Sequence, residues 1–140
     1  MDKYDVLKHY FGHSAFRQGQ ERLIDAVLAG RDVLGVMPTG GGKSLCYQVP
    51  ALMLPGVTLV VSPLISLMKD QVAALKGAGI PAAYINSSLT LEQLHTVYGC
   101  ARRGAYKLLY VAPERLEGEG FAGLVREVNV SLVAVDEAHC

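Results

Sequence analysis

The sequence predicts an α/β fold in which a parallel β-sheet carries helices on both faces. Short apolar runs that suit strands alternate along the chain with longer segments whose apolar residues recur at helical spacing. Several of the strand-like runs are apolar at every position, which is typical of parallel strands buried on both faces. A glycine-rich stretch follows the first run, at the carboxyl end of a strand, where such sheets bind ligands.

The first part of the chain predicts two helices, a strand and a third helix. The apolar residues of the two helices stop before Gly12 and Gly30, and glycine commonly ends a helix. The first strand is expected over residues 32–37. The helix after the glycine-rich stretch is expected to kink or end near Val49, because Pro50 follows it.

The second part predicts four more strands with helices between them. These strands are expected over residues 57–62, 82–86, 107–112 and 131–135. Pro63 suits the first position of a helix, and so does Pro113. Thr90 and Gln93 have the spacing of a capping box at the start of another helix. The chain stops soon after the last strand, so we expect a fold truncated there.

Composition limits the class of protein without identifying a partner. With 140 residues and 51% hydrophobic content, the chain is long enough for a globular domain with a core. The 13 basic and 13 acidic residues balance, which gives no overall electrostatic footprint for nucleic acid but leaves room for a local basic groove. Three widely spaced cysteines and the lack of a long apolar run predict a soluble, intracellular protein with no membrane partner.

A phosphate-binding loop is predicted between the first strand and the third helix. Its residues are Met37-Pro38-Thr39-Gly40-Gly41-Gly42-Lys43-Ser44. The glycines allow backbone N–H groups to point at phosphate oxygens, Lys43 adds a positive charge, and the Ser44 hydroxyl can bind Mg²⁺. The usual pattern has glycine where Met37 stands. The alternative is a glycine-rich turn with Lys43 in solvent.

Two carboxylates at the end of the last strand predict the second half of a nucleotide hydrolase site. Asp136 can hold Mg²⁺, commonly through water, and Glu137 can orient or deprotonate the attacking water. The alternative for this pair is a solvated strand end. His139 is either a surface histidine or a sensor of nucleotide state that acts on another domain.

Several stretches of the chain resemble RecQ-type DNA helicases of superfamily 2. The residues Asp136-Glu137-Ala138-His139 resemble the motif that gives this superfamily one of its group names. The loop that starts at Met37 resembles the Walker A loop of the RecQ family, including the methionine. Three further stretches resemble the upstream adenine motif and motifs Ia and Ib of the family: residues 16–20, 61–71 and 110–116.

This resemblance implies a RecA-like P-loop domain in an ATP- and Mg²⁺-dependent DNA helicase that moves 3′-to-5′ and acts in recombination and repair. It implies that Gln20, with Arg17 nearby, binds the adenine edge, although on the residues alone Gln20 could equally face water. It also implies contacts with single-stranded and partly duplex DNA at the helix starts after two strands. The residues concerned are Ser62, Pro63, Lys69 and Arg115, and ordinary helix capping is the alternative there.

The family pattern divides the chain into N-terminal helices with the adenine motif, residues 1–30, and an incomplete ATP-binding domain, residues 31–140. Zinc is expected only in a later domain, and an arginine finger in a second motor domain, so this piece should bind nucleotide but hydrolyse it poorly. The expected location is the cytoplasm and nucleoid of a bacterium or the nucleus of a eukaryote. An RNA-directed helicase of the same superfamily and a catalytically idle nucleotide-binding or interaction module remain alternatives.

Overall fold

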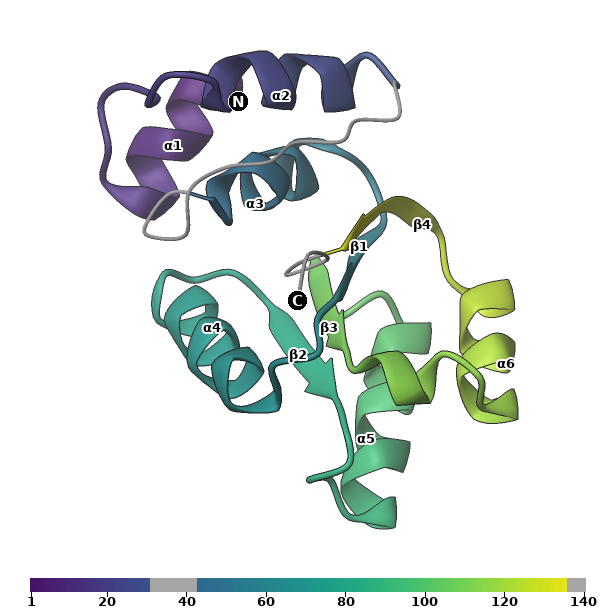
Figure 1. The fold of residues 1–140 in the computed structure, drawn as a ribbon. Coiled ribbons are helices and arrows are strands. Elements are labelled where there is room, and N and C mark those ends of the chain that lie inside the picture. Colours follow the sequence, from purple (N-terminus) through teal and green to yellow (C-terminus); the bar gives the residue numbers. More distant parts are fainter. Residues whose placement is uncertain (31–42, 136–140) are drawn as a thin grey trace. The chain divides into compact units, whose positions relative to one another are not determined.

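The computed structural model describes residues 1–30 and 43–135 (Figure 1). The chain divides into two compact units, Met1–Leu54 and Pro55–Cys140. The strand expected over residues 32–37 lies outside the described residues. None of the helices in the described ranges combines the length and apolar character that a membrane crossing needs.

The first unit contains three short helices around a small apolar core. Helices α1 (Lys3–Phe11), α2 (Gln20–Leu28) and α3 (Leu45–Met53) pack through Val6, Ile24 and Val49. A capping box formed by Asp2 and Asp5 begins α1, and Gly12 ends it with a φ of 72°. The two predicted N-terminal helices are therefore confirmed.

Helix α3 runs through Pro50, so the predicted end near Val49 is wrong, while the alternative of a kink there stays a prediction. Pro50 and its neighbours Val49 and Ala51 are buried. A proline inside a helix costs about 3 kcal/mol, but most helical stability in proteins comes from tertiary packing. The burial of this apolar helix against α1 and α2 offsets that cost, and α3 continues to Met53.

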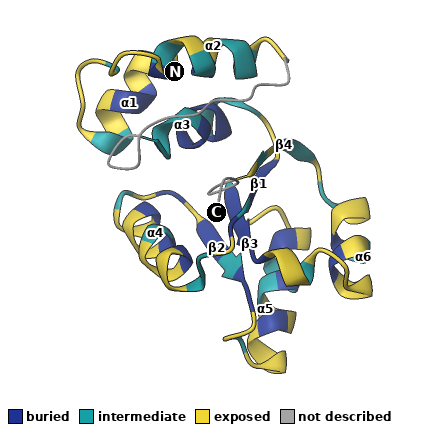
Figure 2. Ribbon diagram, viewed as in Figure 1, coloured by how far each residue is buried: buried dark blue, intermediate teal, exposed yellow. Residues whose placement is uncertain are grey.

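The second unit is built on a parallel four-stranded sheet, as the sequence predicts. The strands are β1 (Val57–Val61), β2 (Ala82–Ile85), β3 (Leu108–Val111) and β4 (Val130–Val135). Their order across the sheet is β2-β3-β1-β4, and all three pairings are parallel. Strand β3 is buried throughout, and β1 at all but its last residue, which explains why neither contains a charged residue (Figure 2).

Helices cover both faces of this sheet. Helices α5 (Leu91–Arg102) and α6 (Glu119–Glu127) bury Leu94, Tyr98 and Leu124 against one face. Helix α4 (Ile65–Gly77) packs on β2, and the Tyr110 hydroxyl donates a hydrogen bond of 2.8 Å to Gln71 on that helix. The predicted capping box at the start of α5 is also present.

The start of α4 differs from the prediction that Pro63 takes the first helical position. The helix begins at Ile65, with Leu64 as its N-cap. The Ser62 hydroxyl accepts a hydrogen bond of 3.3 Å from the Leu64 backbone N–H. This local side-chain bond holds a turn after β1, and Pro63 occupies the turn instead of the helix.

Pro113 begins only one turn of 3₁₀-helix, η1 (Pro113–Arg115), not an α-helix. The Leu116 N–H bonds to the Pro113 carbonyl, and the Gly118 N–H bonds to the Arg115 carbonyl. Such i-to-i+3 bonds close tight, short helices. Gly118 is then extended and serves as the N-cap of α6 at Glu119.

Candidate functional site

Lys43 and Ser44 lie directly before α3, where the sequence predicts the end of a phosphate-binding loop. The Lys43 carbonyl accepts from the Cys46 N–H at 3.2 Å, and the Ser44 carbonyl accepts from the Gln48 N–H at 2.9 Å. Within the described part of the chain, the Ser44 side chain makes no capping hydrogen bond. A hydroxyl and a lysine at a helix start fit a phosphate and its Mg²⁺.

The starts of α3 and α4 differ from those of the other described α-helices. Four of the six α-helices in the described ranges carry an acidic residue in the first turn: Asp5, Glu21, Glu92 and Glu119. Neither α3 nor α4 has one. A carboxylate in the first turn satisfies the positive end of the helix dipole, so these two starts are better placed to attract an external anion. Both are starts where the sequence predicts phosphate contacts.

Gln20 and Arg17 form a tight turn at the start of α2. The Gln20 side-chain oxygen accepts a hydrogen bond of 2.6 Å from the Arg17 backbone N–H, and the Gln20 N–H bonds to the Arg17 carbonyl at 3.1 Å. Gly19 completes the turn with a φ of 87°, which glycine adopts readily. Gln20 is only 1% exposed. Its amide has two donors and two lone pairs, so this bond is compatible with a second partner such as an adenine edge.

The other half of the predicted nucleotide site falls on residues that the structure does not describe. Residues 37–42 of the predicted loop lie outside the described residues, and so do Asp136, Glu137 and His139. In the described ranges, no group of three or more His, Cys, Asp or Glu side chains is arranged to hold a metal ion. Of the two predicted Mg²⁺ ligands, Ser44 belongs to the described residues and Asp136 does not.

The predicted DNA contacts gather at the carboxyl end of the sheet, with one exception. Ser62 follows β1 and is buried, and its N–H bonds to the Val111 carbonyl at the end of β3. Arg115 belongs to η1, just after β3, and its guanidinium donates to the Asn86 carbonyl after β2 at 3.4 Å. Pro63 lies beside Ser62 and is exposed, whereas Lys69 is exposed further along α4.

Sequence reasoning assigned no role to Asn86 and Ser88, which the structure places at this same end of the sheet. Asn86 is fully buried, and its side-chain oxygen accepts from the Ser88 N–H at 2.9 Å and the Ser88 hydroxyl at 2.5 Å. These bonds shape the loop whose backbone carbonyl meets Arg115. A run of polar residues directly after a buried strand is the signal that could have identified them.

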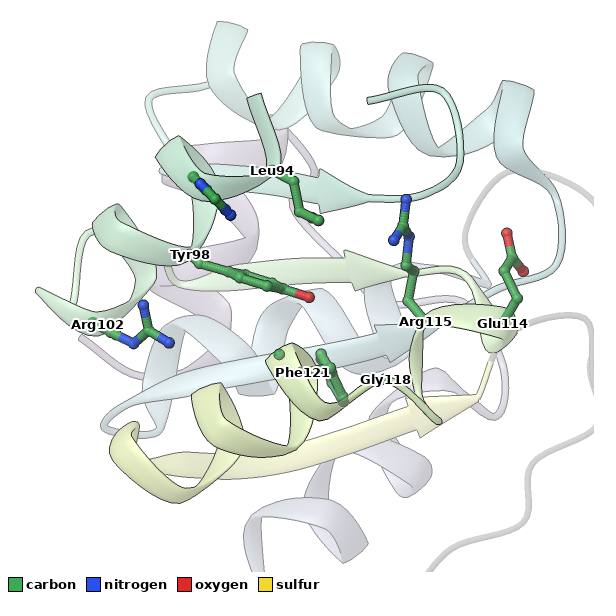
Figure 3. Close-up of a pocket in the computed structure, with 9 residues that line it drawn as sticks. Leu94, Tyr98, Arg102, Glu114, Arg115, Gly118 and Phe121 are labelled. Atoms are coloured by element: carbon green, nitrogen blue, oxygen red, sulfur yellow. The ribbon is translucent and has the colours of Figure 1, made fainter. Parts of the chain in front are cut away.

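A groove with a cavity of about 510 Å³ lies between α5, η1 and α6 (Figure 3). Tyr98 and Phe121 line it together with Arg102 and Arg115. Burial raises the pKa of Tyr98, while the two guanidinium groups act in the opposite direction. The Arg115 Nε atom is buried and has no hydrogen-bond partner among the described residues. Arg115 thus lies both in this groove and at the carboxyl end of the sheet, where its guanidinium meets the Asn86 carbonyl.

Residues 17–140 match the family model described as DEAD/DEAH box helicase. The match covers nearly all of the chain, including every predicted site residue. The chain belongs to the DEAD/DEAH box helicase family.

Several curated relatives of this chain carry RecQ names. It is 53% identical over 136 residues to the "ATP-dependent DNA helicase RecQ" of Bacillus subtilis, covering 96% of this chain and 23% of that protein. It is 55% identical over 135 residues to the protein of the same name from Haemophilus influenzae, covering 96% of this chain and 22% of the relative. It is 43% identical over 144 residues to the "RecQ-like DNA helicase blm-1" of Caenorhabditis elegans, covering 98% of this chain and 15% of that protein.

The resemblance to RecQ-type helicases is thereby confirmed. The chain spans less than a quarter of the length of these relatives. DEAD/DEAH box helicases are enzymes that use ATP and Mg²⁺, and the described start of α3 fits that use.

Proposed function

We propose that this chain forms the ATP-binding part of the motor of a RecQ-type DNA helicase. The complete enzyme would use ATP and Mg²⁺ to move 3′-to-5′ along DNA in recombination and repair. The observation that carries the proposal is the start of α3, where Lys43 and Ser44 precede a helix with no acidic residue in its first turn. The names of the Bacillus subtilis and Haemophilus influenzae relatives, both "ATP-dependent DNA helicase RecQ", support the same function.

The proposed nucleotide site divides its work between two stretches of the first unit. Lys43 and the backbone of residues 37–42 hold the outer phosphates, and the start of α3 adds the positive end of its dipole. Gln20 presents its amide to the adenine edge, with Arg17 beside it. This pairing favours adenine over guanine, because the two bases present different donors and acceptors at that edge.

The proposed hydrolysis depends on Ser44, Asp136 and Glu137. Bound Mg²⁺ neutralises charge on the outer phosphates, and the Ser44 hydroxyl and the Asp136 carboxylate are the oxygen ligands that would hold it. Glu137 orients the attacking water and accepts its proton. His139 transmits the state of the nucleotide to the rest of the protein.

The proposed DNA contact is the strand-end surface formed by Ser62, Pro63, Asn86 and Arg115. The α4 start offers backbone N–H groups to a phosphate, and Arg115 supplies a guanidinium fixed by the Asn86 carbonyl. Lys69 adds a positive charge further along α4. Single-stranded and partly duplex DNA are the proposed partners, in the bacterial nucleoid or the eukaryotic nucleus.

ATP hydrolysis by the full-length protein tests this function. The rate is measured with Mg²⁺ alone, with single-stranded DNA and with single-stranded RNA, for the wild type and for Lys43→Ala and Glu137→Gln. We expect stimulation by DNA and a loss of about 10²-fold or more in both variants, the scale of removing a preorganised group from a reacting phosphate or carbonyl. Lys76→Ala, at an exposed position on α4, is the matched control and should hydrolyse ATP normally.

Other outcomes separate the alternatives. Stimulation by RNA in place of DNA would move the protein to the RNA-directed helicases of this superfamily. Full activity in Lys43→Ala would show that the predicted loop does not bind the reacting nucleotide. A wild type with no hydrolysis under any condition would favour an idle binding module.

A further inference from the structure

Tyr4, in the first turn of α1, contacts both ends of the stretch that carries Arg17 and Gln20. Its ring packs against the Phe16 ring, with centroids 5.7 Å apart and planes tilted by 51°. Its hydroxyl donates a hydrogen bond to the Glu21 carboxylate. Phe16 and Glu21 directly flank the turn from Arg17 to Gln20. The Tyr4 side chain therefore contacts the residues on both sides of this turn.

Lys3 reinforces the attachment on the α2 side. Its ammonium group lies 2.5 Å from the Asp25 carboxylate and 2.7 Å from the Glu21 carboxylate. The Lys3 side chain is only 16% exposed, although it is charged. The hydrogen bonds to Asp25 and Glu21 raise the pKa of Lys3, and those from Lys3 and Tyr4 lower the pKa of Glu21. Connected charges of this kind fix geometry better than an isolated surface pair.

The turn needs such external support because its own backbone is permissive. Gly19 lies inside the turn with a φ of 87°, and glycine can adopt other backbone conformations unless contacts elsewhere hold the chain. The bond between the Gln20 side chain and the Arg17 N–H shapes the turn internally. It does not orient the turn against α1, whereas Tyr4 and Lys3 do.

We propose that Lys3 and Tyr4 are positioning residues that place Gln20 and Arg17 for the nucleotide, and so set the affinity for ATP and the preference for adenine. This inference rests on the proposed function, in which Gln20 reads the adenine edge. A misplacement of about 1 Å at a positioning group can cost up to 10²-fold in rate. Val6 and Leu7 are the buried residues of α1. Substitutions at Lys3 and Tyr4 therefore leave the packing of this helix in place.

The test compares steady-state hydrolysis of ATP and GTP by full-length variants, at saturating single-stranded DNA. The variants are Tyr4→Phe, which keeps the Phe16 contact but loses the hydroxyl, Lys3→Met, and the double variant. We expect the double variant to raise the KM for ATP about fivefold, with kcat within about twofold of the wild type and a smaller preference for ATP over GTP. Lys3→Arg should stay closer to the wild-type values than Lys3→Met, because a guanidinium keeps a positive charge beside the two carboxylates.

Lys8→Met, at an exposed position on the same helix, is the control for general effects on α1. Gln20→Ala separates this inference from the function on which it rests. If Gln20→Ala weakens the preference for adenine and the double variant behaves like Lys8→Met, the positioning role is overturned while the adenine role stands. If Gln20→Ala leaves the preference unchanged, both are overturned. A double variant with a lower melting temperature but unchanged KM values has lost structural support only, which also overturns the inference.

Discussion

The two compact units hold their predicted functional residues in different ways. In Met1–Leu54, the turn of Arg17 and Gln20 is held by polar contacts from α1 and by a small core that includes Val6, Ile24 and Val49. In Pro55–Cys140, Ser62 and Arg115 stand at the ends of parallel strands whose interiors are buried. Changes to the polar contacts around the first unit's turn should therefore alter nucleotide binding, while changes to the buried strands of the second unit should mainly lower the free energy of unfolding.

The largest expected effect is the loss of a buried side chain from the sheet. Leu108 in β3 is fully buried, and it pairs in register with Thr58 on one side and Ala82 on the other. Leu108→Ala should lower the free energy of unfolding by about 2–5 kcal/mol, through lost apolar burial and the cavity left behind. Denaturant unfolding of the full-length protein measures this. Leu91→Ala, at a side chain 69% exposed, should change it by about 0.5 kcal/mol or less, and equal costs for the two would contradict the comparison.

Arg115→Gln should weaken DNA binding with little effect on the nucleotide. The guanidinium lost is the one fixed by the Asn86 carbonyl at the end of the sheet. Removing one phosphate contact should reduce the slope of log affinity against log salt by about 1. Fluorescence anisotropy with labelled single-stranded DNA at several salt concentrations gives this slope. Arg126→Gln, at an exposed position on α6, serves as the control, and an equal change there would remove the assignment to Arg115.

A surface cap in the second unit should affect stability and not function. The Thr90 hydroxyl accepts from the Gln93 N–H at 3.1 Å, and the Gln93 side chain accepts from the Thr90 N–H at 2.9 Å. Thr90→Ala should cost about 1 kcal/mol in the free energy of unfolding. Thr90→Ser keeps the hydroxyl and should cost less. The KM for ATP should stay at the wild-type value in both, and a rise would show that surface polar groups of this unit also control the nucleotide.

The smallest expected effect is the acid sensitivity of the contact between α1 and α2. Lys3 and Tyr4 lower the pKa of Glu21 below its usual 4.5. A lowered pKa in the folded state gives stability that is present above pH 4.5 and lost as the pH falls through the folded-state value. The melting temperatures of the wild type and Glu21→Gln should therefore differ at pH 7 and converge as the pH falls through the lowered pKa of Glu21. Glu117→Gln, at an exposed position, is the control and should have the melting temperature of the wild type at pH 7.

Much of the fold could be predicted because its signals are local. The four described strands, the capping box at Thr90 and the glycine end of α1 each depend on residues only a few positions apart. Lys43 and Ser44 were likewise recognisable as part of one short motif before a helix. The departures at Pro50 and Pro63 share a cause, since proline has a strong local preference that packing or a neighbouring hydroxyl overrode.

The sequence by itself determined the strand and helix pattern, the phosphate-loop motif and the likeness to RecQ-type helicases. The tertiary structure alone decided the strand order β2-β3-β1-β4, the bond from Arg115 to the Asn86 carbonyl and the double contact of Tyr4 with Phe16 and Glu21. Local patterns record the periodicity and capping that neighbouring residues impose on each other. Arg115 and Asn86 are 29 positions apart and Tyr4 and Glu21 are 17 apart, so only the folded chain brings them together.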